Sequence, residues 1–208
     1  MPMPAPPQGS TLFDLAGGHP ALDLVNSLDN RFRADGPNEN LLGFDELLRF
    51  LRETALLSPD QARVLKKKSS SAAAESVLRA VRELREASAA VWYAAVEEKA
   101  PPAPDLQTLE RYFLETNSQR RLHWEESGPR WRWSAEDGSD PRLTLWILSQ
   151  SVSDLFFSDQ ATLIRTCGVD TCRWLFIDTS KNHTRRWCNM KVCGNRMKAR
   201  RFQARRSS

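Results

Sequence analysis

The sequence predicts an α+β protein, with a helix-rich N-terminal domain that contains a small antiparallel sheet, followed by a compact basic C-terminal module. Three observations support this prediction. Apolar residues recur at helical spacing in the N-terminal part, two short segments alternate polar and apolar residues, and all four cysteines lie after position 166. With 208 residues, 40% hydrophobic content and a mean hydropathy of −0.53, the composition is that of a globular protein and excludes collagen-like and membrane-spanning classes.

The first ten residues, MPMPAPPQGS, form a proline-rich segment that we expect to be a disordered tail. The segment has no Lys or Arg, and its prolines interrupt any apolar run, so it does not resemble a secretory signal. The longest apolar stretches, such as the one from Leu143 to Leu148, are far shorter than the roughly 20 residues of a bilayer crossing. We therefore expect a cytoplasmic protein that does not enter a membrane.

Helical periodicity dominates the N-terminal part of the sequence. Residues 22–26 are compatible with a strand or with a first helical turn, and periodicity does not decide between them. Ser58, Pro59 and Gln61 have the spacing of an N-cap, a first helical residue and a capping box for a helix that ends at Lys68. The complete set of expected helices covers residues 44–55, 59–68, 72–98, 106–117 and 141–157.

Two segments, 120–124 and 130–133, alternate polar and apolar residues with a period of two. A Glu-Ser-Gly-Pro turn joins them, and the pattern predicts an antiparallel hairpin. We expect Trp131 and Trp133 to belong to the core rather than to a ligand pocket, and His123 to be structural.

The charges are divided into two blocks. Residues 1–164 contain 18 basic and 24 acidic residues, a balance of −6, whereas residues 165–208 contain 12 basic and 2 acidic residues, a balance of +10. A basic C-terminal segment is often a solvated or disordered tail. The cysteines favour a folded module instead.

All four cysteines lie within 27 residues of this basic block, as two Cys-x4-Cys pairs separated by fifteen residues: Cys167, Cys172, Cys188 and Cys193. Two close thiolate pairs are the usual ligand set of a tetrahedral structural zinc site. Disulfides, buried inert thiols and redox thiols are the alternatives. A reducing compartment argues against disulfides, and the clustering argues against incidental burial. We therefore predict one structural Zn²⁺.

Between the cysteine pairs, residues 173–177 are rich in strand formers, 178–184 resemble a turn, and 185–188 return in extended form. Residues 195–206 contain good helix formers without Pro or Gly. The predicted order is knuckle, β-hairpin, knuckle and helix, similar in outline to a treble clef. We expect the small core of this module to consist of Trp174, Phe176, Trp187 and Phe202.

The string from Cys188 to Arg196, preceded by Cys167-x4-Cys172 and by Phe176-x-Asp178, resembles the CGNR zinc-finger family, found at the C-terminus of bacterial proteins. Upstream, the segment 18–27 (GHPALDLVNS), with Arg31, is similar to the start of the ABATE domain, which precedes the finger in that family. The resemblance implies a stress-linked transcription regulator whose finger binds DNA. We accordingly place an ABATE-like sensor domain at residues 11–160 and a CGNR-type finger at 165–206.

The charge block and the resemblance together predict a DNA-binding transcription regulator whose larger domain senses a ligand or partner. The candidate phosphate or groove contacts are basic residues of the terminal helix and of the hairpin. These candidates are Lys181, Arg185, Arg186, Arg196, Lys198, Arg200, Arg201 and Arg205. One alternative is a zinc-stabilised protein-interaction module that docks onto acidic partners or onto the acidic N-terminal domain. Another is an RNA-binding protein, although the sequence lacks aromatic stacking signatures.

A small polar cluster near the N-terminus is a candidate small-molecule site. Its members are His19, Asp23, Asn26 and Arg31. The alternative is that Asp23 and Asn26 are helix caps and that Arg31 forms a surface ion pair. The sequence has no nucleophile elbow, no phosphate-binding glycine loop and no HExxH motif, and it contains only three histidines. We therefore predict no enzymatic activity. The sequence does not indicate an oligomeric state.

Overall fold

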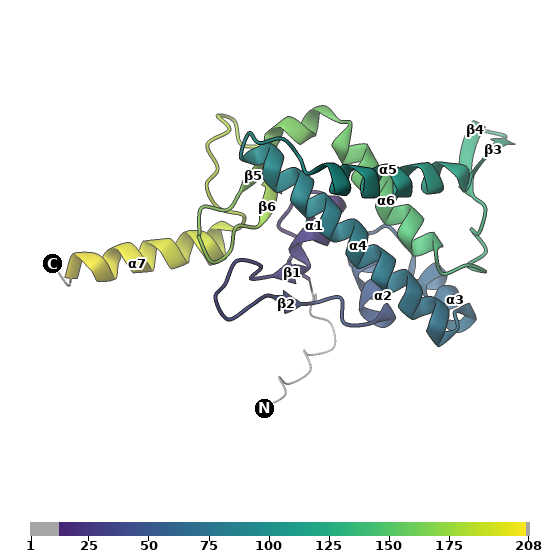
Figure 1. Cartoon of the computed structure of the whole chain (residues 1–208), viewed down its shortest axis with the longest axis horizontal. Coiled ribbons are helices and arrows are strands. Elements are labelled where there is room, and N and C mark those ends of the chain that lie inside the picture. Colours follow the sequence, from purple (N-terminus) through teal and green to yellow (C-terminus); the bar gives the residue numbers. More distant parts are fainter. Residues whose placement is uncertain (1–12, 207–208) are drawn as a thin grey trace.

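The computed structural model describes residues 13–206, and the predicted disordered tail lies outside this range. A bundle of helices forms the N-terminal part of the molecule (Figure 1). Its elements are α1 (Pro20–Asn26), β1 (Leu28–Asp29), β2 (Asn38–Glu39), α2 (Phe44–Glu53), α3 (Pro59–Lys68), α4 (Ser71–Val96), α5 (Ala103–Ser118), β3 (Arg120–Glu125), β4 (Gly128–Trp133) and α6 (Leu143–Phe156). The C-terminal module follows as η1 (Asp159–Leu163), β5 (Ile164–Thr166), β6 (Leu175–Ile177), η2 (Met190–Gly194) and α7 (Asn195–Arg206).

Two helices organise the core. The long helix α4 packs against α1, α2, α5 and α6, and nine of the fourteen residues of α6 are buried. Trp146 of α6 is fully buried, and its indole N–H donates to Glu115 at 3.0 Å, which satisfies the only polar atom of the ring. The helical periodicity of the sequence therefore corresponds to one continuous core.

Local signals define the helix ends. At α3, the Ser58 side chain accepts from the Gln61 N–H at 3.2 Å and Gln61 reaches back to the Ser58 N–H at 2.9 Å, the capping box that the sequence predicts. Residues 22–26, which periodicity left undecided, are helical. Pro20 begins that helix, α1, and the His19 side chain caps it by accepting from the Ala21 N–H at 3.2 Å.

The strands form three separate two-stranded antiparallel sheets. The β3–β4 hairpin has the predicted position, but its apolar face is not covered: Trp131 is 58% exposed and Trp124 is 82% exposed. The expectation that Trp131 belongs to the core is therefore wrong, because a period of two identifies which side chains share a face but not whether another element covers that face. Trp133 is half-buried against the core.

The C-terminal module is a four-cysteine module with a hairpin and a terminal helix, as predicted, but one strand pairs differently. β6 pairs with β5, which precedes the first cysteine pair, and residues 185–188 form no strand. The hairpin thus encloses the first cysteine pair instead of connecting the two pairs. Phe176 is fully buried and Trp174 and Trp187 pack beside it as expected, whereas Phe202 is 62% exposed because α7 projects away from the rest of the molecule (Figure 1).

The hairpin of the C-terminal module is part of the main core. β5 packs against α4 and β6 against α1, and Ile164, Leu175 and Ile177 are buried together with the helices of the N-terminal part. The Ile177 N–H donates to the Gly17 carbonyl at 2.9 Å, and Tyr93 donates its hydroxyl to the Arg173 carbonyl at 2.9 Å. Between residues 13 and 206, no helix has both the length and the apolar composition needed to cross a membrane.

Candidate metal centre and basic surface

The four cysteine sulfurs converge on one point. All four Sγ atoms lie within 4.8 Å of one another, and all four residues are buried. The Cys172–Cys188 and Cys188–Cys193 Sγ–Sγ distances are both 3.7 Å, far longer than the roughly 2.05 Å of a disulfide. A tetrahedron with Zn–S bonds of about 2.3 Å has edges of about 3.8 Å. Two of the sulfur–sulfur distances therefore match this edge, and all four sulfurs are close enough to surround one ion.

The electrostatics of the thiols also favour a cation. Hydrogen bonds from the thiols of Cys172 and Cys188 lower the pKa of Cys167, and donating those bonds raises the pKa of Cys172 and of Cys188. Burial raises the pKa of Cys193. Without a metal, the first thiolate thus suppresses ionisation of its neighbours. A divalent cation at the centre removes this conflict, since it binds all four groups as thiolates.

Backbone hydrogen bonds shape the first cysteine pair. The Cys172 N–H donates to the Val169 carbonyl at 2.8 Å, which closes a tight turn, and the Cys167 N–H donates to the Trp174 carbonyl at 2.8 Å across the hairpin. Gly168 donates its N–H to the carbonyl of Arg186 at 2.9 Å. A Cβ atom on Gly168 would lie 3.2 Å from the Trp187 ring, so a glycine allows the two cysteine segments to approach closely.

Asn189 organises the second pair. Its side-chain oxygen accepts from the Lys191 N–H at 2.9 Å, and its carbonyl accepts from the Cys193 N–H at 2.9 Å. Gly194 is buried against the Met190 side chain, which would have to move to admit a Cβ atom. Asn195 begins α7 and donates to the Lys191 carbonyl at 3.0 Å. The last ligand is thus attached directly to the start of the basic helix.

Arg185, one of the candidate nucleic-acid contacts, binds groups within the finger. Its guanidinium donates to the Trp187 carbonyl at 2.9 Å and to the Cys188 carbonyl, and it lies 4.4 Å from the Phe176 ring centroid. Asp178, a position of the family motif, accepts from the Arg185 N–H at 2.9 Å, and hydrogen bonds from Ser180 hold its pKa below the usual value. Arg185 and Asp178 therefore brace the segment that leads to Cys188.

Comparison with known protein families gives two matches. Residues 18–159, more than half of the chain, match ABATE, a family described as "Putative stress-induced transcription regulator". The chain belongs to the ABATE family. Residues 164–206, which follow the ABATE domain, are a CGNR zinc finger. A comparison with curated proteins found no match.

The CGNR finger holds one structural zinc through Cys167, Cys172, Cys188 and Cys193. Four thiolates complete the tetrahedron, so no coordination position is left for a substrate or an activated water. Bound zinc supplies folding free energy, on the order of 10–16 kcal/mol in small metal-dependent modules. Neither ABATE nor the CGNR finger is described as an enzyme family.

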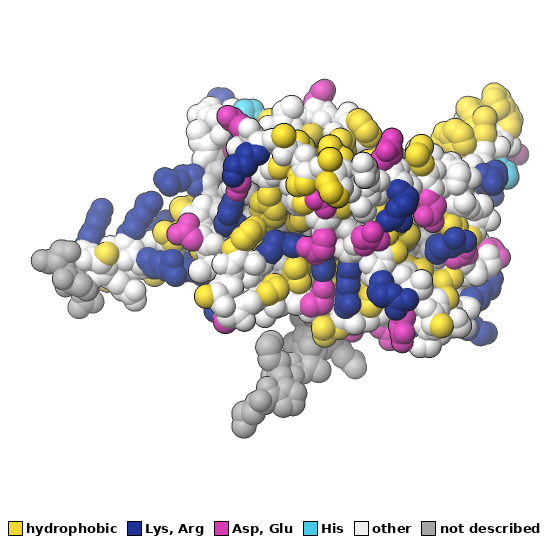
Figure 2. All heavy atoms as spheres, viewed as in Figure 1, with side chains coloured by type: hydrophobic (Ala, Val, Ile, Leu, Met, Phe, Trp, Pro, Cys, Tyr) yellow, Lys and Arg dark blue, Asp and Glu magenta, His cyan; other side chains and the backbone are white. Residues whose placement is uncertain are grey.

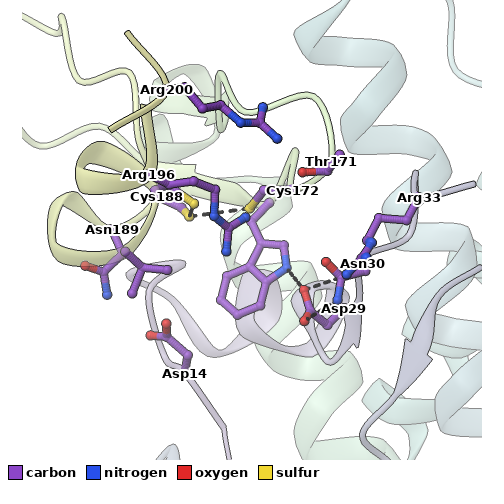
Figure 3. Close-up of a pocket in the computed structure, with 13 residues that line it drawn as sticks. Asp14, Asp29, Asn30, Arg33, Thr171, Cys172, Cys188, Asn189, Arg196 and Arg200 are labelled. Carbon is purple, nitrogen blue, oxygen red and sulfur yellow. Dashed lines mark hydrogen bonds between the residues drawn. The ribbon is translucent and has the colours of Figure 1, made fainter. Parts of the chain in front are cut away.

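A cleft of about 510 Å³ separates the CGNR finger from the start of the ABATE domain (Figure 3). Arg196 and Arg200 of α7 and Arg33 of the ABATE domain line it together with three of the zinc ligands. Four thiolates and Zn²⁺ carry a net charge of −2. The three arginines of the cleft outnumber its two carboxylates, Asp14 and Asp29, by one, so the side chains offset part of this charge. Arg196 and Arg200 thus lie on the zinc side of the helix.

The opposite side of α7 carries a second set of cations. At 3.6 residues per turn, Lys198, Arg201 and Arg205 lie on one side of the helix, and Arg196 and Arg200 lie on the other. Figure 2 shows basic side chains distributed along this projecting helix. Within the described part of the chain, no ion pair involves these five residues or the exposed Lys181 and Arg186 of the finger.

The four residues of the predicted polar cluster do not converge on one site. Asp23 accepts from the Gly17 N–H at 2.8 Å, and Asn26 is buried against Leu175 of the finger. His19 caps α1, and Arg31 pairs with Glu86 of α4. Asp23 and Asn26 therefore hold α1 against its neighbours, and Arg31 links the segment after α1 to α4. His19 borders a pocket.

Proposed function

We propose that this protein is a DNA-binding transcription regulator that contacts the phosphate backbone with the outer side of α7. The observation that carries the proposal is the row of Lys198, Arg201 and Arg205, which are exposed and lack acidic partners among the described residues. Exposed Lys181 and Arg186 add two further cations on the same finger. These side chains form no ion pair with a carboxylate of the protein. They can therefore replace the counterions of DNA phosphates.

The shape of α7 supports a nucleic-acid contact. The helix packs against η2 at its start and then extends into solvent (Figure 1). A helix of this length is marginally stable when isolated, and its mostly exposed side chains leave it little packing to stabilise it. Phosphates along the outer side would offset the repulsion between its cations and stabilise the helix. The B-DNA major groove is wide enough to admit such a helix.

A salt titration tests this contact. If the five cations each neutralise one phosphate, the logarithm of the binding constant falls with the logarithm of the salt concentration with a slope of about −4.5. Fluorescence anisotropy with a labelled duplex, using the full zinc-loaded chain, measures that slope. A slope near zero contradicts the proposal.

Two matched variants test which side of α7 binds. Lys198→Ala, Arg201→Ala and Arg205→Ala together remove the outer cations while alanine preserves helix propensity, so the slope falls by about 3 in magnitude. Arg196→Ala with Arg200→Ala removes cations from the cleft side and leaves most of the slope. Zinc content, measured for both, confirms that the finger remains folded. If the two variants lose equal parts of the salt slope, the proposal that DNA contacts the outer side of α7 is contradicted.

The same titrations separate the other functions that the sequence left open. A protein-interaction module would show a small salt slope with DNA and would lose capture of an acidic protein in the outer-side variant. An RNA-binding protein would prefer single-stranded RNA to the duplex in direct competition. Selection of bound sequences from a random DNA library tests sequence preference, and no enrichment would mean attachment through the backbone alone.

We assign the sensing role to the ABATE domain and no catalytic role to the chain. Asn26 of α1 and Tyr93 of α4 both bind backbone groups of the finger, and Arg173 pairs with Glu97 at the end of α4 at 2.6 Å. A change in the packing of α1 or α4 therefore has a direct physical route to the zinc-bound module. A reducing cytoplasm, where the thiolates stay reduced and DNA is accessible, suits this function.

A further inference from the structure

A second pocket, of about 470 Å³, lies inside the ABATE domain between the start of α1, helix α6 and the β3–β4 hairpin. This volume is within the range of small-molecule sites. Trp131, Trp133 and Ile147 form its apolar wall, whereas His19 and Asp154 contribute polar groups. Residues from distant parts of the ABATE domain thus converge on one pocket, which is distinct from the cleft beside the zinc.

Part of the aromatic wall remains exposed to a ligand. In the hairpin register, Trp131 is opposite Leu122 and Trp133 is opposite Arg120, so these four side chains share one face. The guanidinium carbon of Arg120 lies 5.0 Å from the Trp131 ring centroid and 5.8 Å from that of Trp133. These rings therefore already attract a cation, while Trp131 remains 58% exposed.

The pocket has one carboxylate that no ion pair neutralises among the described residues. Asp154 is exposed at the rim, accepts one hydrogen bond from Gln150 at 2.6 Å, and forms no ion pair within residues 13–206. The Glu136 carboxylate also lines the pocket. Arg132, which also lines the pocket, pairs with Glu125 at 2.7 Å and with Glu136 at 4.0 Å. A cationic ligand would complement Asp154 better than an anionic one.

The remaining polar groups suit binding rather than covalent catalysis. Ser151, His19 and Asp154 all line the pocket, but the His19 Nδ1 atom accepts from the Ala21 N–H at 3.2 Å and is not oriented by Asp154. This contact places the proton of the neutral ring on Nε2, and burial lowers the pKa of His19, which favours the neutral ring. The His19 Nε2–H is therefore the donor that the ring offers, and the Nδ1 contact does not match that of a nucleophilic triad.

We propose that this pocket binds a small aromatic amine, with the ring against Trp131 and Trp133 and the ammonium group beside Asp154. This ligand class would be the signal in the sensing role proposed above. That interpretation rests on the proposed function, whereas the binding itself requires no DNA. Ring stacking supplies the apolar contact, and the carboxylate at the rim selects the positive charge.

Three indole compounds of nearly the same shape test the charge preference. Isothermal titration of the full zinc-loaded chain without DNA compares tryptamine, which carries an ammonium group, with neutral tryptophol and anionic indoleacetate. We expect tryptamine to bind at one site per chain and tryptophol to bind at least about tenfold more weakly, a difference of about 1.4 kcal/mol, with no binding of indoleacetate. No saturable binding of tryptamine, or tighter binding of indoleacetate, would overturn the proposal.

Matched variants locate the site. Asp154→Asn and Trp131→Ala should each weaken tryptamine binding at least about tenfold. Asp159→Asn and Trp124→Ala remove an exposed carboxylate and an exposed ring that do not line the pocket, and they should bind as the unmodified protein does. Equal affinity in all four variants overturns the assignment. DNA affinity is measured separately, so a protein that binds tryptamine but not DNA contradicts only the proposed function.

Discussion

The side chain of Asn26 binds both backbone polar groups of Leu175, which lies 149 positions further along the chain. Its Oδ1 accepts from the Leu175 N–H at 3.0 Å, and its Nδ2 donates to the Leu175 carbonyl at 2.9 Å. Asn26 therefore occupies the place of a neighbouring strand at the free edge of β6. Both residues are buried, so no water replaces these bonds if the side chain is lost.

Replacing Asn26 with Ala should destabilise the protein strongly. The change leaves the Leu175 N–H and carbonyl unpaired in the core, at a cost of roughly 2–5 kcal/mol in the free energy of unfolding. Urea denaturation measures this cost, and Asn38→Ala, at an exposed position of β2, is the control. A loss similar to that of the control would mean that the contact contributes little to stability.

Removal of zinc should destabilise the whole chain and not only the finger. Ile164, Leu175 and Ile177 of the finger segment are buried in the same core as the ABATE helices, so loss of the metal loosens both parts. We expect one zinc per chain by elemental analysis, and a single thermal transition that shifts to lower temperature when a chelator is added. Restoring zinc should reverse the shift. An unchanged melting temperature after complete metal removal would contradict this coupling.

Adjacent arginines of the finger should have different effects. Arg185→Ala removes hydrogen bonds to backbone carbonyls near Cys188 and the contact with Phe176, so we expect a loss of roughly 2–3 kcal/mol and faster release of zinc to a chelator. Arg186→Ala removes an exposed cation, so stability should change little while the DNA salt slope falls by about 1. Urea denaturation and the salt titration measure both effects. The reverse pattern would contradict these roles.

The sequence predicts the features that depend on local signals. The capping box at Ser58, the apolar stripe of α4 and the grouping of the four cysteines each involve neighbouring positions, and each appears in the structure. Contacts between distant segments leave no such signal. The pairing of β6 with β5, and the bond between Asn26 and Leu175, depend on how the finger packs against α1.

Two features of the candidate sites also could not be predicted from the sequence. The composition alone shows that α7 is basic. Which of its cations face the zinc and which face outward depends on where the cysteines lie relative to the helix, and the sequence does not show this. Likewise, alternation placed Trp131 on an apolar face, and only the arrangement of α1 and α6 makes that face the wall of a pocket. A periodic pattern fixes relative orientation within an element, not its surroundings.

The buried carboxyl group of Asp23 should give the protein a distinct pH dependence. Its side chain accepts from the Gly17 N–H at 2.8 Å, and burial raises its pKa to about 7. In the unfolded chain its pKa is near the ordinary value of 3.8. At a pH between these two pKa values, the folded state therefore binds the proton more tightly than the unfolded state does. As the pH rises from about 4 to about 7, this group therefore lowers stability, by at most roughly 4 kcal/mol.

The variant Asp23→Asn isolates this effect, because an amide oxygen can still accept from Gly17 but does not titrate. Urea denaturation of both proteins with excess zinc, between about pH 5 and pH 8, should show the variant gaining stability relative to the unmodified chain as the pH rises. The contribution of the zinc site cancels in this difference, since both chains keep the same thiolates. Asp159→Asn, at an exposed position, should follow the unmodified chain. If Asp23→Asn also follows it at every pH, then the Asp23 carboxyl group ionises in the folded protein as it does in the unfolded chain.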